Sequence, residues 1–427
     1  MSAIITNNFK IQNAINFTSV ANASNYYITI GKIDEWQDKS LKPTNTLATY
    51  RSLWNNMIGG KAISKDRVSL VIPRINWSQN VLYSMYDDAD ENLYNKNFYV
   101  MTDDRNVYVC LDNNNGEPST IKPTGTGTAN MELSDGYVWK YMYTVSIDDL
   151  AKFDVDNYIP ITNNPIEGSN QSIIMKAAIP GTIDAIKVEN GGLGYVNPVV
   201  NIVGDGEGAS AQAILNGTSI EKIKILTPGK NYTYANIVIT SDEEPTSIAE
   251  TRAIIAPEGG HGSNPVNELY ANRAMVSADL EYDEGGKLPI TNDFRIVTIL
   301  NDPKFRDVNE DEEEIESDVF SQLTKLQLAN ESTVGLFEED ADIIGLASGA
   351  TAKIVSVDDN NVMSIINVNG SFIESETIQS GDNQAVIDSI TQPDLIPNSG
   401  NFIYIDYRKP ISRAEDQKEK IRIILQF

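Results

Sequence analysis

Residues 134–144 contain the pattern that most restricts the fold of this chain. The dipeptide Asp135-Gly136 favours a tight turn, because glycine takes a positive φ without steric cost. After the turn, aromatic residues alternate with other residues, and a period of two is that of a β-strand. The alternating aromatic residues are Tyr137, Trp139, Tyr141 and Tyr143. The period predicts all four rings on one face, either in a sheet core or against a partner, and ordinary half-buried strands favour the core.

Length and charge limit the architecture and the partners. At 427 residues the chain exceeds one ordinary domain, so we expect several. It carries 60 Asp and Glu against 33 Lys and Arg, a formal net charge of -27. Such a surface repels phosphate backbones and anionic lipid, which argues against nucleic acid or a membrane as a partner. The single cysteine, Cys110, lies in an apolar run and is expected in the core.

The N-terminus has no basic region followed by an apolar run, and no window approaches roughly 18 continuous apolar residues. We therefore expect neither a standard export signal nor a transmembrane segment. The chain is expected to be made and assembled in cytosol.

An internal repeat occupies the middle of the chain. Its isoleucine, glycine and tyrosine positions recur 37 residues later, and the alternation between them is preserved. The matched positions are Ile183, Ile186, Gly192 and Tyr195 with Ile220, Ile223, Gly229 and Tyr232. A fixed offset of this kind predicts a duplicated unit of two strands and a turn, stacked on its copy. We interpret 170–255 as an inserted β module that folds separately from the rest.

A helix is expected after Pro43-Thr44, because apolar residues follow at three- and four-residue spacing. These residues are Leu47, Tyr50, Leu53, Trp54, Met57 and Ile58. The helix should end at Gly59-Gly60, where a left-handed cap is easy.

The predicted fold is mainly β with a few short helices, a β-sandwich-rich core of α+β character, and two inserted β modules. The acidic run that begins at Asn309 lacks the glycine of an EF-hand loop, so a solvated linker is expected rather than a calcium site. The segments are 1–165 (N-terminal part of the core with helices), 170–255 (repeat module), 256–308 (core continuation), 309–330 (acidic linker), 331–395 (second β module) and 398–427 (C-terminal strands completing the core).

His261 is the only histidine, and it lies between two glycines. A metal site or a nucleophile triad needs further ligands or partners, and no cluster of histidine and cysteine accompanies it. We therefore expect no catalytic residue, no metal and no cofactor.

Four motifs occur in a fixed order. They are Ile72-Pro73-Arg74 with Trp77, the run Val107-Tyr108-Val109-Cys110-Leu111-Asp112, the run Ser134-Asp135-Gly136-Tyr137-Val138-Trp139, and Arg408-Lys409-Pro410-Ile411 with Asp416-Gln417 before a closing apolar strand. In this order they resemble the dimeric baseplate wedge subunit of T-even-type contractile-tailed bacteriophages (myoviruses). The resemblance covers about 240 residues, more than a typical domain, and is interrupted by the two inserted modules. Those modules have no counterpart in the family pattern, and Ser134 stands where the pattern has glycine.

The resemblance implies a structural protein of the virion that is not an enzyme. It further implies a homodimer that joins neighbouring wedge proteins in the tail baseplate, assembled in the host cytoplasm. The residues that we regard as structural or interface candidates are Tyr137, Trp139, Tyr141, Tyr143, Trp77, Arg74 and Trp54.

Two alternatives stay open from the residues alone. A carbohydrate-binding tail adhesin is suggested by Tyr195, Tyr232 and Tyr234, which lie beside glycine-rich turns. A carboxylate-based glycosidase acting on the host surface needs only two positioned Asp or Glu residues. With 60 carboxylates in the chain, spacing cannot select such a pair.

Overall fold

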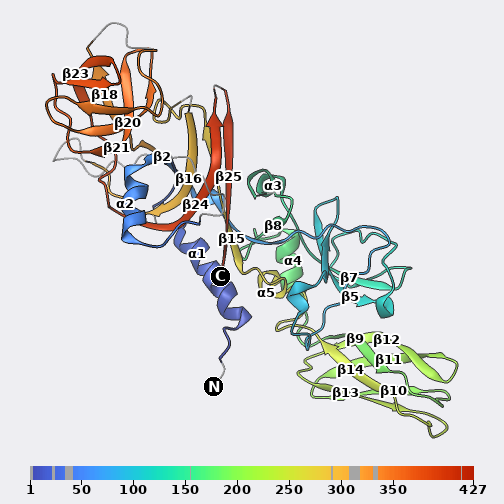
Figure 1. Cartoon of the computed structure of the whole chain (residues 1–427). Coiled ribbons are helices and arrows are strands. Elements are labelled where there is room, and N and C mark those ends of the chain that lie inside the picture. The colour runs from blue at the N-terminus through green and yellow to red at the C-terminus, as the bar shows by residue number, and fades with distance from the viewer. Residues whose placement is uncertain are drawn as a thin grey trace. The chain divides into compact units, whose positions relative to one another are not determined.

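A computed structural model describes residues 3–21, 25–33, 42–153, 155–289, 292–306, 318–329, 335–414 and 416–427. In these ranges the chain is built mainly from β-strands with five α-helices, which confirms the predicted mainly β fold with a few short helices (Figure 1). The chain forms two compact units. Unit 1 comprises Met1–Thr18, Ser69–Met275 and Ile424–Phe427, and unit 2 comprises Ser19–Val68 and Val276–Ile423.

The central sheet of unit 1 is buried on both faces. Its antiparallel strands follow the order β4 (Tyr99–Met101), β5 (Asn106–Asn113), β7 (Tyr137–Thr144) and β6 (Met131–Glu132). On β5, Val107 and Val109 point into one apolar cluster, whereas Tyr108 and Cys110 point into another. Cys110 is fully buried, as expected from its apolar run. A strand that is buried on both faces has apolar residues at successive positions, and residues 107–111 form such a run.

Other elements of unit 1 cover the two faces of this sheet. The first cluster receives Ile11 from α1 (Asn7–Ala21), Ile72 from β3 (Val68–Pro73) and Ile159 from β8 (Tyr158–Ile161). β3 and β8 pair antiparallel. The second cluster receives Ile174 from α4 (Asn170–Ala177), so α4 packs on the core, although the predicted repeat module begins at residue 170. The remaining helical segments are α3 (Ile147–Phe153), α5 (Pro265–Glu268), η2 (Leu93–Asn95) and η3 (Asn114–Gly116).

The repeat module contains six strands, three in each copy. The first copy has β9 (Ile183–Asn190), β10 (Val199–Gly204) and β11 (Glu207–Asn216), and the second has β12 (Ser219–Lys230), β13 (Ala235–Thr240) and β14 (Glu250–Ile255). They form a sheet of order β11-β12-β9-β14 and a separate pair β10-β13. The expectation of two strands in each copy was therefore one strand short.

The two copies pair with each other about a local twofold axis. Ile186 pairs with Ile223, its own equivalent, and Val199 and Val203 pair with Thr240 and Asn236. The missed third strand recurs at an offset of 40 rather than 37, with Ala209, Ala213 and Ile214 matching Ala249, Ala253 and Ile254. The hydroxyls of Tyr195 and Tyr232 accept equivalent bonds from the amides of Ala249, at 2.8 Å, and Ala209, at 3.4 Å. The second copy has three additional residues before β14. The offset of 37 residues therefore does not hold for this strand, and the repeat pattern does not reveal it.

Unit 2 contains a five-stranded antiparallel sheet. Its order is β17 (Val319–Ser321), β2 (Met57–Ala62), β1 (Tyr26–Gly31), β16 (Asn292–Asn301) and β24 (Asn401–Arg413). α2 (Leu47–Asn55) begins at the cap Thr46, whose hydroxyl accepts from the amide of Thr49. It packs Leu53 and Trp54 against Tyr27, Phe320 and Phe402. Three further elements of the chain are η1 (Lys65–Arg67), β15 (Arg273–Glu281) and β25 (Lys418–Gln426).

The predicted end of this helix at Gly59-Gly60 is wrong. α2 ends at Asn55, and Met57 to Gly60 belong to β2. The glycines serve close packing instead, because a Cβ on Gly59 would lie 2.5 Å from the Phe320 carbonyl oxygen. A Cβ on Gly60 would lie 2.8 Å from the Phe320 ring. Helical spacing of Met57 and Ile58 could not reveal a neighbour that is distant in the chain.

Gly60→Ala should destabilise the protein by about 1–3 kcal/mol, because the added methyl group overpacks a filled site. Its Cβ would also lie 2.7 Å from the backbone oxygen of Ile28, which cannot rotate away. Urea unfolding measures the loss. Gly127→Ala is the matched control, since no atom lies within 4 Å of that Cβ. Equal unfolding midpoints for the two variants would contradict the packing role of Gly60.

The second β module is a closed six-stranded barrel. Its strands, in barrel order, are β18 (Thr324–Leu328), β21 (Val362–Asn369), β20 (Thr351–Val357), β19 (Asp342–Gly345), β22 (Thr377–Ser380) and β23 (Asn383–Thr391). The predicted linker 309–330 therefore overlaps β17 and β18, which lie between residues 319 and 328. The acidic run from Asn309 to Glu314 lies outside the described residues.

Candidate functional site

The aromatic residues of β7 lie in the interior of unit 1. Exposed fractions are 0% for Tyr137, Trp139 and Tyr141 and 3% for Tyr143. The Trp139 ring stacks on Tyr137 at 5.5 Å between centroids, and Tyr83 meets it edge-on at 5.7 Å. The rings of Tyr137, Trp139 and Tyr141 share one cluster with Tyr108. They contact residues of their own unit, as core residues do.

Tyr143 departs from the predicted single aromatic face. It lies in the cluster of Val107 and Val109, on the other face of the sheet. The cause is a register shift, because Tyr141 pairs with Tyr108 whereas Tyr143 pairs with Val107. One extra residue on β7, Met142, is a β-bulge that reverses the alternation beyond it. Burial there raises the pKa of the Tyr143 phenol well above its ordinary value, and its hydroxyl donates to the Pro160 carbonyl at 3.2 Å.

The other three candidate residues do not form one site. Trp54 lies in unit 2, is 5% exposed and meets Phe402 at 5.6 Å between ring centroids. Trp77 and Arg74 lie in unit 1 and are half-buried. The indole nitrogen of Trp77 donates to the Ser119 hydroxyl at 3.2 Å, and Arg74 Nε donates to the Asn76 side chain at 3.0 Å.

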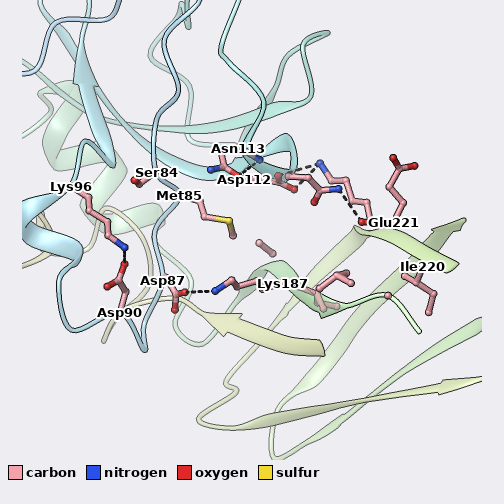
Figure 2. A pocket seen from close by; sticks show the side chains of 17 residues that line it. Ser84, Met85, Asp87, Asp90, Lys96, Asp112, Asn113, Lys187, Ile220 and Glu221 are labelled. Atoms are coloured by element: carbon pink, nitrogen blue, oxygen red, sulfur yellow. Dashed lines mark hydrogen bonds and ion pairs between the residues drawn. The ribbon is translucent and has the colours of Figure 1, made fainter. Parts of the chain in front are cut away.

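A polar cleft of about 560 Å³ lies between the repeat module and the rest of unit 1. Figure 2 shows Asp87, Asp90 and Lys96 on the core side and Lys187 with Ile220 and Glu221 on the module side. The remaining lining residues are Ser84, Met85, Asp112, Asn113, Asn115, Gly116, Ala185, Ile186, Val188, Gly191 and Lys222.

Ion pairs join the module to the core around this cleft, with the cation on the module. Arg252 contacts Asp87 at 2.5 Å and Asp88 at 2.9 Å. Lys222 lies 3.0 Å from Asp112, and Lys224 lies 2.6 Å from Glu132. Burial tends to lower the pKa of Arg252, but its bonds to Asp87 outweigh this and raise it. These ion pairs attach the repeat module to the rest of unit 1 along the cleft, and we call this set of contacts the docking seam.

Three carboxylates of the cleft, those of Asp87, Asp90 and Asp112, each form an ion pair with a lysine or arginine. Lys187 lies 3.9 Å from Asp87 (Figure 2). A hydrogen bond from Lys96 lowers the pKa of Asp90. A glycosidase needs the opposite arrangement, one carboxyl group with a raised pKa that donates its proton to the leaving group. Among the residues that the structure describes, no group of three or more His, Cys, Asp or Glu is placed to hold a metal ion.

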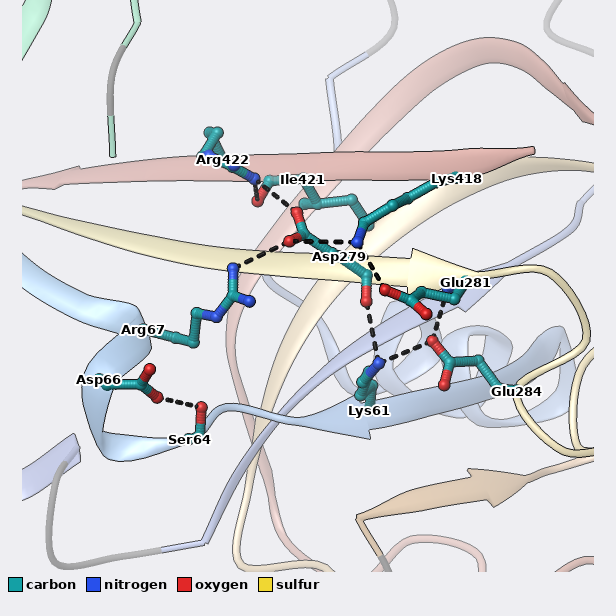
Figure 3. Close-up of polar contacts among 10 residues, drawn as sticks. All are labelled: Lys61, Ser64, Asp66, Arg67, Asp279, Glu281, Glu284, Lys418, Ile421 and Arg422. Carbon is teal, nitrogen blue, oxygen red and sulfur yellow. Dashed lines mark hydrogen bonds and ion pairs between the residues drawn. The ribbon is translucent and has the colours of Figure 1, made fainter. Parts of the chain in front are cut away.

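A second ionic network lies in unit 2 and centres on Asp279 of β15 (Figure 3). Its carboxylate lies 2.9 Å from Arg67 Nη1 and 3.2 Å from Arg422 Nη1. Lys61 Nζ donates to the Asp279 backbone oxygen at 3.0 Å and to Glu284 at 2.8 Å. Burial acts to raise the pKa of Asp279, but the two arginine bonds outweigh it and lower the pKa. The network ties β15 to β2 and β25, and its members are too far apart in the chain for spacing to reveal them.

The tyrosines that suggested sugar binding are mostly internal. Tyr195 is 2% exposed and Tyr232 is 5% exposed, and both rings belong to the core of the repeat module. Their recurrence at the repeat offset thus reflects equivalent packing positions. Tyr234 differs, with 57% of its surface exposed.

In the ranges described, none of the helices combines the length and the apolar character needed to span a membrane.

No family model matches the chain. A search of known proteins finds similarity to baseplate wedge protein gp8 of Enterobacteria phage T4, with 23% identity over 201 residues. The match covers 37% of this chain and 60% of the relative. Over part of its length, the chain is thus distantly similar to a phage baseplate wedge protein.

Proposed function

We propose that this protein is a structural component of the baseplate wedge of a contractile phage tail. In this proposal it is not an enzyme, and it links neighbouring wedge proteins during tail assembly. The observation that carries the proposal is the similarity to the T4 baseplate wedge protein.

The charges described above support an assembly role. The carboxylates of Asp87, Asp112 and Asp279 are engaged by lysine and arginine, which suits cross-linking of strands and modules more than chemistry on a substrate. Two copies of a chain with net charge -27 repel each other over about 8 Å at physiological salt. Its contacts must therefore use apolar patches without carboxylates or basic faces of other wedge proteins.

Immunogold labelling of intact particles of the phage that carries this gene tests the proposal. Antibody against the purified protein should label the tail end, and particles grown without the protein should lack complete baseplates. Antibody against a capsid protein is the control for accessibility. Label on the capsid, or normal infectious tails without the protein, would contradict the proposal.

The purified protein should be a homodimer, as the family resemblance implies. Light scattering at micromolar concentration should give about twice the chain mass of 47.0 kDa, with the twofold symmetry commonest in soluble oligomers. A second measurement at high salt separates the two kinds of contact, since an apolar interface persists there whereas an ionic one weakens. A monomeric mass at both salt concentrations would refute the dimer.

A further inference from the structure

Two adjacent connections, residues 178–182 and 256–262, join the repeat module to the rest of unit 1. The amide of Ala256 donates to the carbonyl of Thr182 at 2.9 Å, so the entering and leaving chains lie side by side. A Cβ on Gly260 would lie 2.1 Å from the Ile179 carbonyl oxygen, and Gly260 has a φ of +93°. We call these two connections the neck.

His261 bridges the core and the module at this neck. Its side chain is 5% exposed, and Nδ1 lies 2.6 Å from Oε1 of Glu268 on α5. On its other side, Nε2 lies 3.7 Å from Oδ2 of Asp184 on β9, the first strand of the module. The second oxygen of Glu268 accepts from the amide of Gly262 at 2.8 Å. The imidazole thus stands between a carboxylate of the core and a carboxylate of the module.

Two further titratable side chains face this group. Lys140 of β7 lines a cavity of about 310 Å³ together with His261 and Asp184, and its ammonium donates to the Thr128 carbonyl at 2.5 Å. The ring of Tyr86 meets the imidazole edge-on at 4.7 Å between centroids, and burial raises its pKa far above the ordinary value. Tyr86 is therefore neutral, and the charges around His261 are two carboxylates and one ammonium.

The two carboxylates next to His261 favour the protonated form of its imidazole. Burial acts to lower the pKa of His261, but the charge and hydrogen bond of Glu268, followed by the charge of Asp184, outweigh burial and the opposing Lys140. The pKa is therefore raised above its ordinary value of 6.5. Only the imidazolium, with an N–H on both ring nitrogens, carries a positive charge, so only it can donate to Glu268 and attract the Asp184 carboxylate at the same time.

We propose that protonated His261 is a latch that holds the repeat module on the core, and that loss of its proton loosens the neck. The side chains of Asp184 and Glu268 are 6% and 2% exposed. A neutral imidazole no longer presents its positive charge to either carboxylate. Asp184 then keeps the bonds from Thr182 and Asn130, and Glu268 keeps the bond from the Gly262 amide, but removal of the cationic partner of a buried carboxylate is destabilising. The ion pairs of the docking seam then remain as the main polar ties between module and core.

The direction of the pH effect follows from the raised pKa. The stabilisation by His261 is fully present below the unfolded-state pKa of about 6.5 and is lost as pH rises through the higher folded-state pKa. The neck should therefore loosen on the alkaline side of neutrality. Each unit by which the folded pKa exceeds 6.5 corresponds to about a tenfold change in the equilibrium between latched and loosened states.

The full-length protein allows a direct test, because His261 is its only histidine. NMR of the single imidazole reports its titration, and hydrogen exchange of residues 178–184 and 256–268, corrected for intrinsic rates, reports the neck. We expect the imidazole to titrate above pH 6.5 and the protection of the neck to fall with the same midpoint. A titration at or below 6.5, or neck protection unchanged across it, would overturn the latch.

Variants separate the latch from general destabilisation. His261→Gln cannot carry the charge, so it should show low neck protection at every pH and no transition. If His261→Gln fails to fold, Asp184→Asn is the alternative variant. Loss of one carboxylate beside the imidazole should lower the pH midpoint of the His261 titration. Lys224→Gln is the control, because its pair with Glu132 lies in the seam and is exposed, and it should keep the transition. A transition that persists in His261→Gln, or an unchanged midpoint in Asp184→Asn, would refute the proposal.

Discussion

Trp139→Ala should lower the free energy of unfolding by about 3–5 kcal/mol, the range typical of a large aromatic residue removed from a core. The ring is fully buried between Tyr137 and Tyr83, and Ile174 of α4 belongs to the same cluster. Alanine leaves a cavity that a β-strand fixed by pairing on both sides, to β5 and β6, cannot close. Guanidinium or urea unfolding followed by circular dichroism measures the loss.

Trp139→Phe tests whether packing alone accounts for this loss. The indole nitrogen of Trp139 is buried and has no hydrogen-bond partner among the described residues. Phenylalanine keeps most of the ring contacts and removes the unpartnered N–H, so its loss should be much smaller than that of alanine. Trp77→Ala, at a half-buried position, is the control for simple loss of an indole.

The outcome also decides between the two roles of this strand. A core role requires that Trp139→Ala lose folding and dimerisation together. A variant that keeps its unfolding midpoint and loses only the dimer mass would make the strand an interface. Both results are readable on purified protein by denaturation and light scattering.

Arg413→Met should destabilise unit 2 by about 3–5 kcal/mol, because it leaves a buried carboxylate without its cationic partner. Arg413 and Glu419 are 6% and 7% exposed, and Arg413 Nε lies 3.3 Å from Glu419 Oε1. The same guanidinium donates to the carbonyl of Pro289 at 2.7 Å and to that of Tyr282. One arginine thus bonds one oxygen of a buried carboxylate and two backbone oxygens near the turn between β24 and β25.

The double variant Arg413→Met with Glu419→Leu isolates the cost of the unpaired charge. Replacing both partners with apolar residues should recover part of the stability lost in Arg413→Met, since the remaining loss comes from the two carbonyls. Arg408→Met is the matched control, because the side chains of Arg408 and Asp406 are 53% and 24% exposed and ion pairs near the surface contribute little. A double variant no more stable than Arg413→Met would contradict the charge explanation.

Sequence patterns identified elements whose side-chain period is local. The alternation at Tyr137, Trp139 and Tyr141 predicted β7, and the apolar run 107–111 predicted the burial of Cys110 on β5, because burial of one or both faces of a strand determines the residue types at neighbouring positions. The repeat likewise marked the positions of Tyr195 and Tyr232, since equivalent packing sites demand equivalent residues. Composition alone set the charge of -27 that any assembly must accommodate.

Only the tertiary structure decided which distant residues meet. The bulge that turns Tyr143 to the opposite face depends on the register against β5, and Gly60 is required by a ring 260 positions away at Phe320. The same holds for the neck, where His261 meets Asp184 from the start of the module. Period and propensity describe the environment of a residue along its own strand or helix. Contacts between strands, and the charges they bring together, are set by pairing and packing across the fold.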